Sequence, residues 1–66
     1  MTIGEKIDIV LQERGLSNRE AAKMIGIREN ALSMYKYDAR PMTLNMFTRF
    51  CKTFDVDANW LIGKDE

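Results

Sequence analysis

This 66-residue chain lacks the residues on which much protein chemistry depends. It has no histidine and a single cysteine, Cys51. Structural zinc sites draw on several Cys and His ligands, and an activated Ser or Cys nucleophile normally needs a histidine base. No acidic pair stands out from those that solvated helix faces carry. We therefore expect no metal site, no cofactor, no small-molecule substrate and no enzymatic activity.

Long apolar runs and low-complexity segments are also missing. No run is long enough to span a bilayer, and no signal-peptide pattern is present. Together with a lone cysteine that cannot form an internal disulfide, this favours the reducing cytoplasm and no membrane partner. We expect residues 1–66 to form a single folded domain. The acidic end at residues 63–66 suits either a natural tail or the beginning of a linker.

The chain has no net charge, because ten basic side chains balance ten acidic ones. Neutrality at first argues against nucleic acid as a partner, since affinity for nucleic acids depends on neutralising phosphates. The distribution of charge changes that conclusion. Residues 14–52 carry eight basic and three acidic side chains, a net charge of +5, whereas residues 1–13 carry −2 and residues 53–66 carry −3. The middle of the chain can therefore present a positive face.

The spacing of apolar residues predicts five helices and no strand. The first begins near residue 3, leaves Lys6 for solvent and is closed by Gly15 in the left-handed conformation. Ser17, followed three residues later by Glu20, predicts a capping box at the start of a second helix that Gly26 ends. This short helix is expected to run through Ala21, Ala22, Met24 and Ile25.

The remaining helices are predicted from similar signals. A third covers residues 29–37, with Arg28 where a capping side chain would be preferred. Thr43 is expected to cap a fourth helix, and Asp57 a short fifth one that Gly63 ends. The third helix is expected to bury Ala31, Leu32 and Tyr35. The fourth is expected to carry an apolar stripe of Leu44, Phe47, Phe50, Cys51 and Phe54. Such a chain is all-α, a compact five-helix domain.

Two short helices joined by a tight glycine-containing turn suit a helix-turn-helix, whose second helix enters the major groove of DNA. Residues 16–27, LSNREAAKMIGI, and residues 56–63, VDANWLIG, together resemble the lambda-repressor-like (Cro-type, XRE-type) helix-turn-helix DNA-binding family. The resemblance covers nearly the whole chain. It implies that the second and third helices bind double-stranded operator DNA, and that the chain is a sequence-specific transcriptional regulator of phage- or prophage-repressor type.

The resemblance also implies which residues read bases. Four residues match the exposed recognition-helix positions: Glu29, Asn30, Ser33 and Met34. Asparagine can bond adenine N6 and N7 together, glutamate can accept from cytosine N4, serine suits several base edges, and methionine suits a thymine methyl group. Two of the four depart from the family pattern. Met34 stands where Arg, Lys or Gln is common, and Glu29 brings a negative charge towards phosphates.

Other residues match positions that contact the DNA backbone or a second subunit. Asn18 matches the residue, often Gln, that binds a phosphate at the start of a helix. The remaining candidate backbone contacts are Arg19, Arg28, Lys36, Tyr37 and Arg40. Lys36 replaces a Glu that the family often carries and so adds positive charge. Trp60 either closes the core or, with Asn59 and Leu61, lies at a dimer contact, as binding to paired half-sites would imply.

Two functions remain open at this point. The leading hypothesis is a homodimer on a partly palindromic operator, with half-sites about one helical turn apart. The alternative is a protein-interaction module on the same fold, such as an antirepressor or a toxin-neutralising antitoxin. Three features favour this alternative: the neutral net charge, Glu29 and Met34. An exposed methionine is natural at a protein contact.

Overall fold

The computed structural model describes residues 1–63; the part of the expected tail or linker at 64–66 lies outside the described residues. Within residues 1–63 the chain forms five helices and no strand. They are α1 (Ile3–Glu13), α2 (Asn18–Ile25), α3 (Glu29–Lys36), α4 (Leu44–Phe54) and α5 (Ala58–Ile62). The prediction of an all-α, compact five-helix domain is confirmed.

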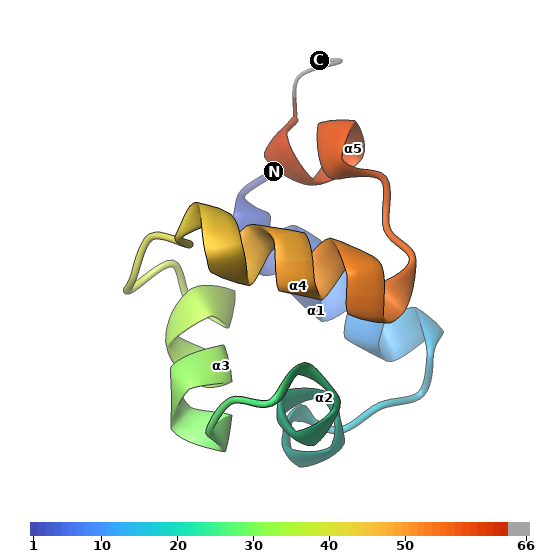
Figure 1. Ribbon diagram of the computed structural model, residues 1–66, viewed down its shortest axis with the longest axis vertical. Helices are drawn as coiled ribbons and strands as arrows, with labels where there is room; N and C mark the ends of the chain where they lie inside the picture. Colours follow the sequence, from blue (N-terminus) through green and yellow to red (C-terminus); the bar gives the residue numbers. More distant parts are fainter. Residues whose placement is uncertain (64–66) are drawn as a thin grey trace.

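The helices are arranged so that α2 and α3 lie together at one end of the molecule. In Figure 1, α4 crosses in front of α1, while α5 lies at the opposite end, close to the N-terminus. The α3 helix packs against both α1 and α2, and α4 packs against α2 and α5. The two short helices are therefore held from behind by the longer α1 and α4.

All five helices contribute apolar side chains to one core. Phe50 of α4 is fully buried, and its ring centroid lies 5.0 Å from that of Phe54. The other buried apolar residues are Ile7, Val10, Leu11, Ala21, Ala22, Ile25, Leu32, Tyr35, Met46 and Leu61. Helices of two turns are marginal on their own, so α2 and α3 depend on this core for their stability.

Side-chain hydrogen bonds cap the start of every helix in residues 1–63 except α3. The backbone N–H of Glu20 donates to Ser17 Oγ over 3.1 Å, and the backbone N–H of Ser17 donates to Glu20 Oε1 over 3.0 Å, as the predicted capping box requires. A second capping box, between Thr2 and Glu5, starts α1 and was not predicted. The α3 helix follows Arg28, which makes no capping bond with its side chain, as expected.

The other predicted helix ends are confirmed as well. Thr43 accepts from the backbone N–H at the third position of α4, and Asp57 accepts from the backbone N–H at the second position of α5. Gly26 ends α2 with φ of 90°, a left-handed conformation that costs glycine little because it has no Cβ. These signals are local in sequence, which is why the boundaries could be predicted closely.

The prediction that Lys6 faces solvent is wrong. Its side chain is only 3% exposed. The ammonium donates to the carbonyl oxygen of Trp60 over 2.6 Å and lies 5.4 Å from the centroid of the indole ring. The same carbonyl also accepts from the backbone N–H of Gly63 over 3.1 Å. A long lysine side chain can reach such a carbonyl at the end of a helix while its methylenes pack on apolar surface.

Two large apolar residues are exposed, and one of them, Leu44, was predicted to lie on the apolar stripe of the fourth helix. Leu44 is 81% exposed and Met24 is 54% exposed. The buried stripe of α4 consists of Met46, Phe50 and Phe54, which follow i, i+4, i+8 spacing, and Leu44 lies away from that line. Met24 lies likewise outside the arc that α2 buries through Ala21, Ala22 and Ile25.

Candidate nucleic-acid interface

The turn between α2 and α3 sets the angle between the two helices. The backbone N–H groups of Gly26 and Ile27 both donate to the carbonyl of Ala22, over 2.9 and 3.0 Å. Ala22 is buried, so a small side chain occupies the side of α2 that faces the core. Leu32 of α3 is buried in the same core. Two helices held in this way form a helix-turn-helix.

The four candidate base-reading residues share one face of α3. An α-helix turns by about 100° per residue, so Glu29, Asn30, Ser33 and Met34 fall within an arc of about 140°. Leu32 and Tyr35, which are buried, lie on the opposite arc. Glu29, Asn30 and Met34 are exposed, and Ser33 is half-buried. Among residues 1–63, none of these four side chains makes a hydrogen bond or ion pair with another residue.

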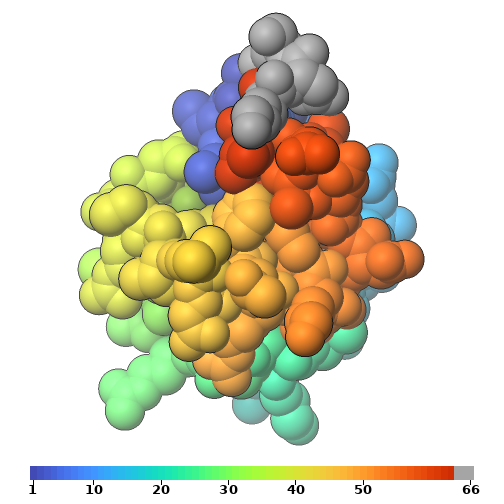
Figure 2. All heavy atoms as spheres, turned by 45° about the horizontal axis from the view of Figure 1, so that its top comes forward, coloured from blue at the N-terminus to red at the C-terminus, as the bar shows by residue number. Residues whose placement is uncertain are grey.

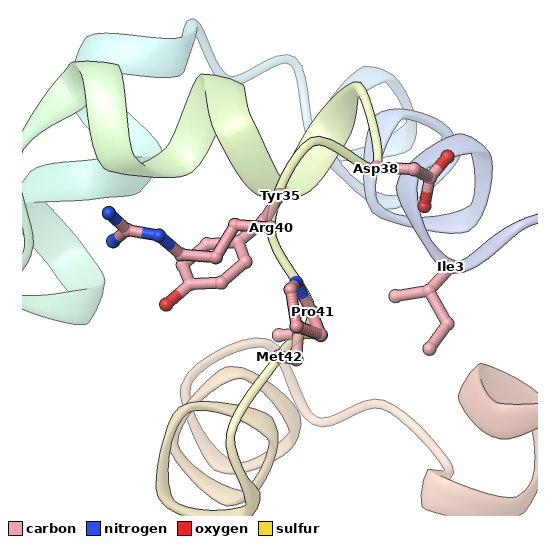
Figure 3. Close-up of a pocket in the computed structure, with 6 residues that line it drawn as sticks. All are labelled: Ile3, Tyr35, Asp38, Arg40, Pro41 and Met42. Atoms are coloured by element: carbon pink, nitrogen blue, oxygen red, sulfur yellow. The ribbon is translucent and has the colours of Figure 1, made fainter.

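A short anchored loop follows α3 and carries two of the candidate backbone contacts. Asp38 has φ of 58°, and its Oδ1 accepts from the backbone N–H of Gly4 over 3.0 Å, which ties the loop to α1. Figure 3 shows the Arg40 side chain extending beside the ring of Tyr35, on the side of the loop away from Asp38. The pocket drawn there measures about 180 Å³ and is lined by Ile3, Tyr35, Asp38, Arg40, Pro41 and Met42.

α1 and α3 approach each other closely at Gly4. This glycine is buried, and a Cβ at its position would overlap the backbone carbonyl of Lys36. The last turn of α3 therefore rests directly on the first turn of α1. Since the loop at Asp38 is bonded to the same glycine, Gly4 fixes both the end of α3 and the loop after it.

Most candidate backbone contacts are exposed. Arg19, Arg28 and Arg40 are exposed, and Tyr37 is 76% exposed. In Figure 2 the green segments, which belong to α2, α3 and their turn, project from the lower edge of the molecule. Asn18, at the first position of α2, is half-buried.

Lys36 differs from the other basic candidates because its side chain is half-buried and bonded to neighbouring helices. Its side chain is 13% exposed. The ammonium donates to Asn18 Oδ1 over 2.8 Å and lies 3.1 Å from Asp8 Oδ1, so it joins α3 to α2 and α1. Sequence reasoning placed Lys36 among the exposed cations and missed Asp8 altogether, because a contact between distant helices leaves no signal in helical spacing.

The three candidate dimer residues lie in different environments. Asn59 is exposed, Trp60 packs partly buried against the core, and Leu61 is fully buried. The side chain of Leu61 therefore holds α5 to its own core and is not exposed to a second chain. Ile62, which sequence reasoning did not single out, is 49% exposed next to them.

The local surroundings of Glu20 and Cys51 shift the pKa values of both side chains. A hydrogen bond from the backbone N–H of Ser17, together with the Ser17 side chain, lowers the pKa of Glu20, as its capping role explains. Burial raises the pKa of the Cys51 thiol, and the Asp57 carboxylate raises it further, so the thiol stays protonated at neutral pH. Residues 1–63 hold no cluster of three or more side chains suited to a metal ion. No helix in that range has the length and apolar character to cross a membrane.

The five-helix fold, with α2 and α3 joined by a tight turn and one face of α3 exposed, defines the helix-turn-helix class of protein. A helix-turn-helix family model matches residues 7–61, from the middle of α1 into α5. The chain belongs to the lambda-repressor-like (XRE-type) helix-turn-helix family, as the sequence resemblance implied.

Two curated relatives share this domain. The chain is 30% identical over 66 residues to the HTH-type transcriptional regulator ImmR of Bacillus subtilis, a match that covers 100% of this chain and 52% of ImmR. It is also 30% identical over 64 residues to the HTH-type transcriptional regulator RamB of Mycobacterium tuberculosis, covering 97% of this chain and 14% of RamB. The chain thus spans about half of one relative and a small part of the other. No solved structure matches.

Proposed function

We propose that this chain is a sequence-specific DNA-binding transcriptional regulator, of phage- or prophage-repressor type, that places α3 in the major groove of operator DNA. The observation that carries the proposal is the exposed face of α3, whose polar side chains have no partner among residues 1–63. A major groove about 12 Å wide admits an α-helix and presents a different pattern of donors and acceptors for each base pair. The relatives' description as transcriptional regulators supports the same conclusion, and it favours regulation over enzymatic activity.

Each residue of the exposed face has a base edge that it fits. Asn30 donates to N7 and accepts from N6 of adenine, and Glu29 accepts from N4 of cytosine. Ser33, one turn further on, donates to or accepts from a neighbouring base. Met34, 41% exposed, lies against the methyl group of a thymine.

The backbone contacts come from both sides of α3. Asn18 and Arg19 begin α2, Arg28 precedes α3, and Tyr37 and Arg40 follow it. Contacts of this kind set the register of the protein on the duplex without reading sequence. The net charge of +5 on residues 14–52 supplies attraction to phosphates that the neutral whole does not suggest.

The protein acts in the cytoplasm as a homodimer on paired half-sites. Family members of this kind bind half-sites one helical turn apart, so that the symmetry of the operator follows that of the protein. Asn59, Ile62 and the half-buried Trp60 offer a contact surface on α5 for the second chain.

The test is selection from random duplexes at low salt, followed by binding measurements on the enriched sequence. We expect one enriched sequence and loss of its binding in Asn30→Ala. The matched control is Asn45→Ala, which removes the same exposed side chain from the first turn of α4. The proposal is overturned if no sequence is enriched, or if both variants bind like the unaltered chain.

A second candidate, a protein-interaction module such as an antirepressor or antitoxin, is favoured by one observation. Met24, Met34 and Tyr37 expose 54%, 41% and 76% of their surface on the two helices and the turn that follows them. Large apolar side chains exposed on neighbouring elements can mark a protein contact. Enrichment of a specific duplex, with loss in Asn30→Ala, decides against this candidate.

A further inference from the structure

Four polar side chains form a hydrogen-bonded row behind the proposed DNA-binding surface. Gln12 Nε2 donates to Asp8 Oδ2 over 2.8 Å, and Asp8 Oδ1 lies 3.1 Å from the ammonium of Lys36. The ammonium in turn donates to Asn18 Oδ1 over 2.8 Å. The row runs from α1 through the last residue of α3 to the first residue of α2.

The row determines which end of the Asn18 amide faces outward. An ammonium has only N–H donors, so it can bond the amide oxygen and not the amide nitrogen. With Oδ1 taken by Lys36, the two N–H groups of Nδ2 are the part of the amide left for another partner. These N–H groups can donate hydrogen bonds to a phosphate oxygen. An acceptor at position 36 would turn the amide over and present its oxygen to the phosphate.

The surroundings of Lys36 indicate that it orients Asn18 and does not itself attract a DNA phosphate. The side chain is 13% exposed and its charge is paired with Asp8, which is 43% exposed. An ammonium that is largely shielded from solvent and paired with a carboxylate is poorly placed to meet a phosphate directly. Its contribution to binding passes through the orientation of Asn18.

We propose that Lys36, held by Asp8, is a positioning residue that fixes the Asn18 amide with Nδ2 towards a DNA phosphate. This inference rests on the proposed function, because it assumes that the surface binds DNA. It assigns Lys36 a role through Asn18 in place of the direct phosphate contact that the sequence suggested.

The test removes the ion pair without changing net charge. In Asp8→Asn/Lys36→Met, both charges and the donor to Asn18 are lost. We expect the affinity for the selected duplex to fall about tenfold, within the range that coupled neighbouring residues show. The slope of log affinity against log salt should stay unchanged, because no phosphate-neutralising cation is lost. The matched control is Arg40→Met, for which the slope should fall by about 0.9.

A mutant cycle with Asn18→Ala tests whether the loss of DNA affinity acts through Asn18. Where Asn18 is already alanine, adding Asp8→Asn/Lys36→Met should change affinity by less than about twofold. Equal losses in both backgrounds overturn the inference. A fall in the salt slope of Lys36→Met, in a background that already carries Asp8→Asn, also overturns it, because Lys36 would then contact a phosphate directly.

A charge-reversed pair distinguishes a loss of DNA affinity from a loss of folding. Asp8→Lys/Lys36→Glu keeps the ion pair and the net charge but presents an acceptor to Asn18. We expect unchanged helicity and unfolding midpoint with a loss of affinity of at least about tenfold; unchanged affinity in this folded variant overturns the inference. Absence of specific binding by the unaltered chain overturns the proposed function itself, whereas binding without coupling overturns only the role of Lys36.

Discussion

At the scale of single residues, Gly4 shows how one missing side chain sets the position of α3. Glycine inside a helix normally costs about 1 kcal/mol relative to alanine. Here the hydrogen in place of a side chain lets the backbone of α1 meet the carbonyl of Lys36, and the Gly4 N–H bonds Asp38. The close approach therefore outweighs the ordinary preference of the helix for alanine.

Gly4→Ala should lower the free energy of unfolding by about 1–3 kcal/mol, because the added methyl group pushes α1 away from α3. Urea unfolding followed by circular dichroism measures the change. The control is Gly15→Ala, which meets nothing within 4 Å and carries only the strain of φ at 63°, a cost of about 1–2 kcal/mol. A stabilised Gly4→Ala variant would show that the two helices are not in contact there.

Met34 allows a test of base reading at a single methyl group. Replacing the contacted thymine by uracil in the selected duplex removes the C5-methyl group and no hydrogen bond. Burial of one such group is worth about 0.8 kcal/mol, so the unaltered chain should lose about fourfold in affinity. Met34→Ala should not respond to the replacement. Equal sensitivity in the two proteins would remove Met34 from the proposed contacts.

Several single-residue predictions failed, and for one physical reason. Lys6 is buried, whereas Leu44 is exposed, although helical spacing predicted the reverse. Spacing gives the direction of a Cα–Cβ bond along one helix. It does not say where a neighbouring helix ends, or whether a long side chain bends to reach a carbonyl there.

At the scale of helices, the ends were the most predictable features. Ser17 with Glu20, Thr43, Asp57 and Gly26 all act at helix ends as the sequence indicated. Such signals involve residues that are only a few positions apart, so they need no knowledge of the fold. The missing side-chain cap at the start of α3 was equally visible.

The capping box of α2 predicts a dependence of stability on pH. Its hydrogen bonds lower the pKa of Glu20 below the ordinary value of 4.5, so its contribution to stability is present above that value and is lost as the pH falls through the lowered one. In Glu20→Gln the cap remains without the charge. Urea unfolding at a series of acidic pH values should show the unaltered chain losing its advantage over Glu20→Gln as the pH falls.

The control for this pH series is Glu13→Gln, which removes a carboxylate from the last turn of α1, where no capping box exists. The difference in unfolding free energy between the unaltered chain and Glu13→Gln should not shrink in the same way as the pH falls. A difference between the unaltered chain and Glu20→Gln that stays constant from neutral to acidic pH would contradict the capping account.

At the scale of the whole molecule, the candidate surface was predictable only in part. Residues on one face of α3 could be grouped from spacing alone, because they share a single helix. The row from Asp8 through Lys36 to Asn18 joins three helices and depends on the close approach at Gly4. Nothing in local sequence specifies such a meeting, and only the folded chain shows it.

Dimeric binding predicts a stoichiometry and a spacing. Two chains should occupy one selected duplex with two half-sites centred about one helical turn, 34–36 Å, apart. Analytical ultracentrifugation of the complex measures the first quantity. Inserting five base pairs between the half-sites places them on opposite faces of the duplex and should reduce the two-chain complex strongly. A single chain bound, unaffected by the insertion, would contradict the homodimer.

The most direct test of DNA binding through this surface is a salt series of affinity for the selected duplex, measured by fluorescence anisotropy. Each phosphate neutralised by Lys or Arg adds about 0.9 to the slope of log affinity against log salt. We predict tight binding at low salt with a steep slope that falls in Arg28→Met and Arg40→Met. No binding at low salt, or a slope that neither variant changes, would contradict the account.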